Sequence, residues 1–211
     1  MRKMIFLLSI LFLSPSITRA QERVEAPIWN VGHKWVFTQG NIEVVGADKN
    51  SYTLNFSKDT AILENVGFEK IVFEKSTLSR IYTLKGDKRE KYTHRHRRIL
   101  NFPLNPDKQW QDTFTGKILS GPFAGTSSHN YSESFTVLRW EDVQVRAGKF
   151  KAIKLEYKQK ITTPGALNYG KEGWGRYWYS PDVKYFVKCQ YDKDFYVGEK
   201  DWELTSFQSK K

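Results

Sequence analysis

The sequence predicts an all-β fold: a single antiparallel domain with a strongly curved sheet, arranged as a sandwich or an open barrel. Three observations predict it. Short segments rich in Val, Ile, Thr, Tyr, Phe and Trp recur along the chain, and these residue types favour strands. Gly, Pro, Asn and Asp separate the segments at the spacing expected for turns between antiparallel strands. After residue 20, no segment combines a helical period of apolar residues with helix caps.

The clearest predicted strand covers residues 151–161, where apolar residues such as Leu155 and Tyr157 alternate with charged ones. This alternation is typical of an antiparallel sheet with one dry and one solvated face. A hairpin turn is expected just before it, because Gly148 can adopt a positive φ. A second turn is expected at Ser180-Pro181-Asp182.

The complete set of predicted strands follows from the same signals. They cover residues 34–39, 51–57, 60–65, 68–74, 78–84, 91–100, 110–119, 131–140, 142–146, 149–162, 175–180, 184–191 and 201–208. Two further segments, 116–130 and 163–174, are expected to contain long loops. Long loops in a compact domain are often lids or binding loops, and a plain surface connection fits these two equally well.

The first 20 residues have the pattern of a signal peptide. Arg2-Lys3 precedes an apolar run at 5–13, and Thr18-Arg19-Ala20 places small residues at positions −3 and −1 of a cleavage site before Gln21. The apolar run is too short to span a bilayer, which takes about 20 residues. The predicted organisation is therefore a signal peptide at 1–20, cleaved near Ala20-Gln21, and a single all-β domain at 21–211.

The expected mature chain is basic and has no apolar stretch long enough to cross a membrane. Loss of residues 1–20 removes three positive charges, so the formal charge falls from +11 to +8. An excess of positive charge attracts anionic partners. We expect a periplasmic or secreted protein, for which nucleic acid is not an expected partner.

Two short stretches of the chain echo one another. Val31-Gly-His-Lys-Trp-Val-Phe37 and Pro106-Asp-Lys-Gln-Trp-Gln-Asp-Thr-Phe114 each contain a turn, a polar or basic step and a Trp that opens a predicted strand. The echo fits two similar halves of one sheet, and it fits a chance match as well.

The order of local signals along the mature chain also matches a known pattern. The signals are Asn30-Val-Gly-His-Lys-Trp-Val-Phe37, Phe102-Pro-Leu-Asn-Pro-Asp-Lys-Gln-Trp110, Val145-Arg-Ala-Gly-Lys-Phe-Lys-Ala-Ile-Lys-Leu-Glu156, Tyr177-Trp-Tyr-Ser-Pro-Asp-Val-Lys-Tyr-Phe-Val-Lys188 and Glu203-Leu-Thr-Ser-Phe207. In this order the chain resembles exported bacterial proteins of domain of unknown function 3108 and the TapB-like type. The resemblance implies a curved antiparallel sheet with a lipoprotein-carrier-like outline, and it implies no catalytic residues. The Asn-Pro-Asp of the second signal replaces a Gly turn that is commoner in the family.

The sequence gives little support to catalysis. It has no Gly-x-Ser-x-Gly elbow and no phosphate-binding loop of the Gly-x4-Gly-Lys-Ser/Thr type. Cys189 lies in a predicted strand, where a buried and inert thiol is the favoured interpretation and a reactive thiol the alternative. We therefore predict a protein that is not an enzyme and that uses no cofactor.

Metal binding is not expected either. His94 and His96 would share one face of a strand. A stable site needs further ligands, and the neighbouring Arg95, Arg97 and Arg98 would repel a cation.

A basic stripe, defined by six side chains, is the densest positive stretch of the chain. Its members are Lys88, Arg89, Lys91, Arg95, Arg97 and Arg98. It is a candidate site for an anionic partner such as an envelope protein or an acidic polymer. The favoured alternative is a solvated sheet edge, where lysines discourage aggregation.

An aromatic cluster next to the second predicted loop is the candidate ligand-binding site. Its residues are Tyr169, Trp174, Tyr177, Trp178 and Tyr179. Strand alternation places Trp174 and Trp178 on one face, and Tyr177 and Tyr179 on the other. Core packing is the favoured interpretation, and a surface for a lipid or a sugar ring is the alternative.

These observations lead to two main hypotheses about function, beside a third, a carbohydrate-active enzyme, for which Glu141, Asp142, Glu156 and Glu172 are the available carboxylates. The first is non-enzymatic binding of a lipid-like or amphipathic ligand of the envelope, partly by analogy with the fold. The second is an envelope scaffold or assembly module that docks a partner protein or an acidic polymer through the basic stripe.

Overall fold

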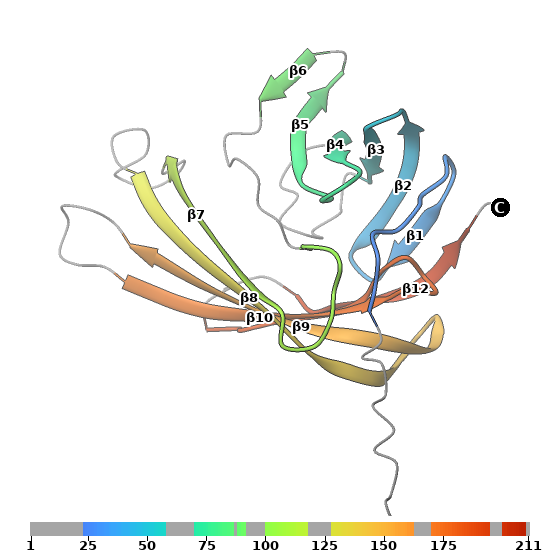
Figure 1. Ribbon diagram of the computed structural model, residues 1–211. Helices are drawn as coiled ribbons and strands as arrows, with labels where there is room; N and C mark the ends of the chain where they lie inside the picture. Colours follow the sequence, from blue (N-terminus) through green and yellow to red (C-terminus); the bar gives the residue numbers. More distant parts are fainter. Residues whose placement is uncertain are drawn as a thin grey trace, which may run out of the picture.

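The computed structural model describes residues 23–57, 70–86, 88–91, 100–117, 128–162, 170–194 and 200–209. These residues form one antiparallel sheet of twelve strands (Figure 1). The all-β prediction is confirmed, and the sheet is continuous rather than a two-sheet sandwich. Within the same ranges, no helix is long and apolar enough to cross a membrane.

Two consecutive meanders of six strands make up the sheet. Its order is β6-β5-β4-β3-β2-β1-β12-β11-β10-β9-β8-β7, so β1 and β12 are the neighbours that are not consecutive in the chain. The first meander contains β1 (Lys34–Phe37), β2 (Gly40–Ala47), β3 (Ser51–Phe56), β4 (Lys70–Glu74), β5 (Arg80–Lys85) and β6 (Lys88–Lys91). The second contains β7 (Gln109–Lys117), β8 (Ser128–Val145), β9 (Gly148–Thr162), β10 (Gly170–Ser180), β11 (Tyr185–Tyr191) and β12 (Trp202–Gln208). The two Trp residues of the sequence echo, Trp35 and Trp110, lie on the first strand of each meander.

The sheet is strongly curved, as predicted. In Figure 1 the short strands of the first meander rise above the long strands β8, β9 and β10, and the sheet bends around a concave face between them. The order of the described strands ends at β6 on one side and at β7 on the other. The sheet is therefore open, with an inner concave face and an outer convex one.

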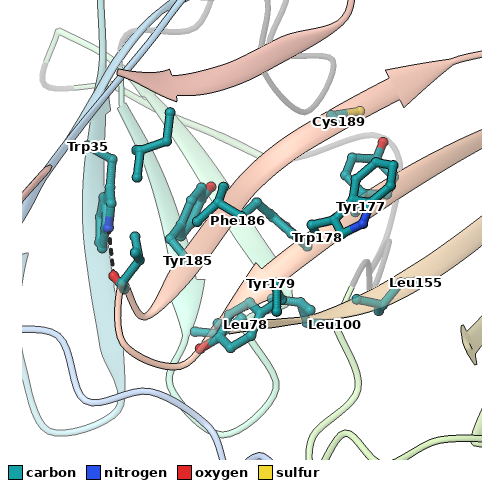
Figure 2. Packing of buried hydrophobic residues seen from close by; sticks show 14 of the residues in the cluster. Trp35, Leu78, Leu100, Leu155, Tyr177, Trp178, Tyr179, Tyr185, Phe186 and Cys189 are labelled. Atoms are coloured by element: carbon teal, nitrogen blue, oxygen red, sulfur yellow. Dashed lines mark hydrogen bonds between the residues drawn. The ribbon is translucent and has the colours of Figure 1, made fainter. Parts of the chain in front are cut away.

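An aromatic core fills the inner face where the meanders meet. Trp35 is 1% exposed, and its ring stacks on Tyr185 at a centroid distance of 4.7 Å. The Trp35 indole N–H donates a 2.9 Å hydrogen bond to the carbonyl of Val183, in the turn before β11 (Figure 2). On β12, Trp202 packs against Phe37 at 5.1 Å. These contacts connect β1 with β11 and β12, so the junction of the meanders is also the centre of the core.

Gly175 in β10 makes room for tyrosines of the neighbouring strands. Gly175 is buried, and a Cβ built on it would lie 3.3 Å from Tyr157 on β9 and 3.6 Å from Tyr191 on β11. Glycine weakens an isolated strand because it has no side chain to pack. Here the rings of the two adjacent strands occupy that space, which explains why a Gly-rich segment forms a strand.

Several predicted elements match the structure. Residues 151–161 lie within β9 with the predicted alternation of buried and solvated positions. Gly148 has a φ of 137° at the turn between β8 and β9. The second predicted turn connects β10 to β11.

Other predictions of elements were wrong. Strand β2 was not predicted, because Ile42 and Val44 are its two buried apolar residues and glycines lie on both sides of them. Residues 131–146 were predicted as two strands but lie in the single strand β8. The predicted loop at 163–174 overlaps β10, which begins at Gly170. The signal peptide, the predicted strand at 60–65, and residues 92–99, 118–127 and 163–169 lie outside the described residues.

Replacement of Trp35 tests the importance of the junction. Trp35→Phe removes the hydrogen bond to Val183 and leaves a void beside Tyr185. We expect the free energy of unfolding to fall by about 2–4 kcal/mol, measured by urea denaturation. Val45→Thr, at a position that is 39% exposed, is the control and should change stability by no more than about 0.5 kcal/mol. Equal effects of the two substitutions would contradict a central role of Trp35.

A β-branched residue at Gly175 tests the packing of the tyrosines. Valine normally favours a strand, but Gly175→Val should destabilise the fold by about 2–3 kcal/mol, because its side chain would overlap Tyr157 and Tyr191. Thr113→Val, on the exposed side of β7, is a control expected to be nearly neutral. A Gly175→Val protein as stable as the wild type in urea would show that the rings do not depend on this gap.

Candidate functional site

The outer face of β8, β9 and β10 carries a polar surface whose composition follows from strand alternation. Lys158 and Lys160 on β9 point away from the core side chains of the same strand, as predicted. The register places Ser134 and Trp174 on either side of Lys158, and Ser132 and Glu172 on either side of Lys160. Side chains that are distant in sequence therefore form cross-strand rows on this face.

A groove of about 440 Å³ lies over these rows. We call it the tryptophan groove. Its lining residues are Ser132, Ser134, Lys158, Gln159, Lys160, Glu172, Gly173, Trp174 and Asp192. Trp174 is half-buried, and the guanidinium of Arg176 lies 4.4 Å from the centre of its ring. The groove thus combines an aromatic ring with hydroxyl and charged groups, while the Gln159 amide is buried on the inner side, where it donates a 2.7 Å hydrogen bond to Glu133.

The charged groups of the tryptophan groove have partners within the protein. Lys160 lies 3.1 Å from Glu172, and Lys158 lies 3.4 Å from Glu156. The Lys160–Glu172 pair is exposed on both sides, and Lys158 is exposed although Glu156 is not; pairs that involve such exposed side chains contribute little to stability. Their side chains are therefore available to a ligand at small cost to the fold.

A second groove of about 380 Å³ lies next to the first. We call it the threonine groove, and its lining residues are Thr113, Phe114, Thr115, Asn130, Tyr131, Ser132, Lys160 and Thr162. Ser132 and Lys160 line both grooves. On its floor, the Thr115 hydroxyl donates a 3.0 Å hydrogen bond to the amide oxygen of Asn130.

The predicted aromatic cluster is divided between the two faces of β10. Tyr177 and Tyr179 pack in the core and are 2% and 1% exposed (Figure 2). Burial raises the pKa of the Tyr179 hydroxyl far above its ordinary value. Trp174 and Trp178 lie on the outer face, opposite Lys158 and Lys154 of β9. The predicted alternation is confirmed, while Tyr169 lies outside the described residues.

Trp178 is covered on the outer face by charged side chains. Its ring is 4% exposed, with the ammonium groups of Lys154 and Lys188 at 4.8 and 5.2 Å from its centre. The indole N–H donates a hydrogen bond to Glu141. Trp178 is therefore part of the packing, and Trp174 is the member of the predicted cluster that lines a groove.

The basic stripe is described in part. Lys88 and Arg89 are exposed on β6, and the Arg89 guanidinium lies 4.9 Å from the centre of the Tyr82 ring. Lys91 ends the same strand. Arg95, Arg97 and Arg98 lie outside the described residues.

Cys189 lies in the core, as the favoured interpretation predicted. Burial raises the pKa of its thiol well above the ordinary value, against a smaller opposite effect of a hydrogen bond with Tyr191. A thiol in this state is a poor nucleophile. Among the described residues, no three His, Cys, Asp or Glu side chains lie close enough to hold a metal ion, and His94 and His96 are not among them.

Sequence reasoning found Trp174 and the polar side of β9, but it missed the rest of both grooves. Ser132, Glu172 and Asp192 carry no motif, and each is an ordinary surface residue when taken alone. They come together through the pairing of β8, β9, β10 and β11. The alternation of β9 was the available signal, and its neighbours could be named only once the register was known.

Comparison with known proteins yields three similar solved structures. No protein-family model matches the chain, and no curated protein matches it. A protein from Bacteroides fragilis, described as exported and of YmcC-like fold, has 14% identity and a TM-score of 0.44, with 88% of this chain and 100% of that chain covered. A protein from Parabacteroides distasonis described as a lipoprotein has 14% identity and a TM-score of 0.41, with 89% and 100% covered. The hypothetical lipoprotein YmcC from Escherichia coli has 9% identity and a TM-score of 0.40, with 87% and 90% covered. The resemblance to the domain of unknown function 3108 stays a prediction, as does export.

The charge of Glu141 gives a prediction about pH. Partial burial raises the pKa of Glu141, but the Trp178 indole N–H and the charges of Lys154 and Arg139 outweigh it, so the pKa lies below its ordinary value of 4.5. A lowered folded-state pKa stabilises the fold above the unfolded-state value, and this contribution disappears as the pH falls through the folded-state value. Glu141→Gln should therefore lower stability at pH 7, by no more than about 1 kcal/mol because the site is partly exposed.

Urea denaturation at pH 7 and at pH 3 measures this difference. The difference in the free energy of unfolding between wild type and Glu141→Gln should be smaller at pH 3 than at pH 7. Glu25→Gln, whose carboxylate is 67% exposed, is the control and should show a smaller gap at both pH values. A difference in the free energy of unfolding that grows on acidification would mean that the Glu141 carboxylate is not stabilised by its neighbours.

Proposed function

We propose that this chain is a non-enzymatic binding protein of the bacterial envelope, and that it holds an amphipathic ligand, such as a lipid-like molecule, on its outer face. The observation that carries the proposal is the tryptophan groove, where the half-buried ring of Trp174 lies among polar side chains. Ligand sites commonly pair an apolar surface with a few polar groups that fix orientation. The envelope location rests on the signal-peptide pattern of residues 1–20.

The packing of the inner face supports placing the ligand on the outer face. Trp35, Tyr177 and Trp202 are each at most 2% exposed. A ligand on the inner face where they lie would have to displace close-packed rings, which costs several kcal/mol for each aromatic side chain removed from the core. A ligand in the tryptophan groove needs no such rearrangement, because that groove is open to solvent.

Trp174 is suited to a ligand with one apolar face. An indole ring is broad, rigid and amphipathic, so it contacts a flat apolar surface at little cost in conformational entropy. Arg176 covers one part of the ring and is itself held by Glu156 at 3.1 Å. The ring is therefore fixed in place before a ligand arrives, and preorganisation of this kind favours affinity.

Native mass spectrometry tests the proposal. The protein is purified without detergent from the periplasm of the cell that makes it, and we expect an additional bound mass. Trp174→Ala should lose that mass, whereas Phe207→Ala, which removes a 37% exposed ring from β12, should keep it. A wild-type protein that is free of ligand and refuses envelope extracts would contradict the proposal, as would a bound mass that survives Trp174→Ala.

The scaffold hypothesis is the alternative if the wild type carries no ligand. It rests on the exposed Lys88 and Arg89 of β6, whose charges would attract a partner protein or an acidic polymer in a salt-dependent way. The outer face of β8 to β10 would then have no part in binding.

A further inference from the structure

The two grooves of the outer face are one continuous surface that runs across the strands. Ser132 and Lys160 line both of them, and these two residues are direct cross-strand partners on β8 and β9. The threonine groove extends from this pair to β7. The tryptophan groove extends to β10 and to Asp192, the residue that follows the end of β11. Five strands at a spacing of about 4.8 Å make this surface about 19 Å long.

The register gives this surface a regular chemical pattern. One row across the strands contains Thr113, Ser132, Lys160 and Glu172, which are partners in that order. The next row contains Thr115, Asn130 and Thr162. Each of these seven residues carries a hydroxyl, an amide or a charged group that can donate or accept hydrogen bonds. A ligand that lay across the strands would meet such groups at each strand spacing.

The composition of the surface disfavours an acyl chain. None of the residues that line the two grooves is Ala, Val, Leu, Ile or Met, whereas pockets for apolar ligands are lined mainly by apolar side chains. The aromatic ring on this surface is that of Trp174, because strand alternation places the stacked pair Phe114 and Tyr131 on the inner face. A ring beside hydroxyls and an amide matches a ligand that has flat apolar faces and many hydroxyl groups.

The charges of the surface balance. Lys158 and Lys160 are the positive residues of the lining, and Glu172 and Asp192 are the negative ones. A surface without net charge recognises its ligand through hydrogen bonds and ring contacts rather than through long-range attraction. Binding should therefore depend little on salt.

From these observations we propose that the ligand of the outer face is a polysaccharide chain of low charge, which lies across β7 to β10 with a sugar ring stacked on Trp174. The inference rests on the proposed function and narrows its ligand from amphipathic molecules in general to one class. The open form of the grooves suits a polymer, because a chain can enter from the side at any point along its length.

Affinity electrophoresis tests the inference with defined probes. The mature protein is run in native gels that contain dextran, galactomannan, β-glucan or polygalacturonate, and binding to phosphatidylglycerol vesicles is measured by flotation. We expect at least one neutral polysaccharide to retard the protein, and the retardation to persist in 0.5 M salt, where charges more than about 4–5 Å apart are screened. Trp174→Ala and Asn130→Ala, at opposite ends of the surface, should each weaken binding at least about tenfold. Phe207→Ala should not.

Each other outcome contradicts the inference in a distinguishable way. Binding to polygalacturonate alone that disappears with salt would indicate docking of an acidic polymer. Binding to vesicles alone, lost in Trp174→Ala but kept in Asn130→Ala, would indicate a lipid headgroup in the tryptophan groove, and the proposed function would stand. Retardation by no polysaccharide overturns the inference. If native mass spectrometry also finds no bound mass, the proposed function fails with it.

Discussion

The packing of Trp35 between the two meanders is the interaction on which the rest of the structure depends. The direct pairing of β11 with β12 is short, with Lys188 opposite Glu203 and Cys189 opposite Trp202. The aromatic contacts of Trp35 with Tyr185, and its hydrogen bond to Val183, span this part of the sheet from β1. Because backbone pairing between β11 and β12 is limited, the packing of Trp35 and its hydrogen bond help to hold β12 against β11. The first meander is placed with it, since β1 pairs with β12 along its whole length.

The aromatic core on the inner face of the sheet leaves the outer face as the surface open to a ligand. The rings that join the meanders occupy the space that a carrier of lipids would leave open, and the tyrosines around Gly175 close the inner side of β10 in the same way. Near the junction, the inner side of the long strands β8, β9 and β10 is thereby packed against rings. Strand pairing sets the pattern of the opposite surface, so the rows of polar side chains on the outer face have defined spacings. Binding sites built on such elements are positioned more accurately than sites on loops.

Sequence patterns predicted those parts of the fold that depend on local chemistry. The alternation in residues 151–161 and the turn at Gly148 were correct because side-chain period and positive φ are properties of short segments. Strand β2 and the start of β10 were missed, since their glycines read as breaks until the neighbouring strands supply the packing. Trp174 was identified as a candidate, but its cluster could not be sorted into core and surface without burial. Partners such as Ser132 and Glu172 depend on register, which long-range pairing determines.

The topology also has a consequence for the rate at which the chain folds. All neighbouring strands of the described sheet except β1 and β12 follow one another in the sequence, so ten of its eleven pairings can form between strands that are consecutive in the chain. The pairing of β1 with β12, which places Trp35 opposite Phe207, closes a loop that contains most of the chain. Closing so long a loop is entropically costly. Folding rates fall as contacts become more distant in sequence. This order of strands therefore implies that the two meanders form first and that β1 pairs with β12 late in folding.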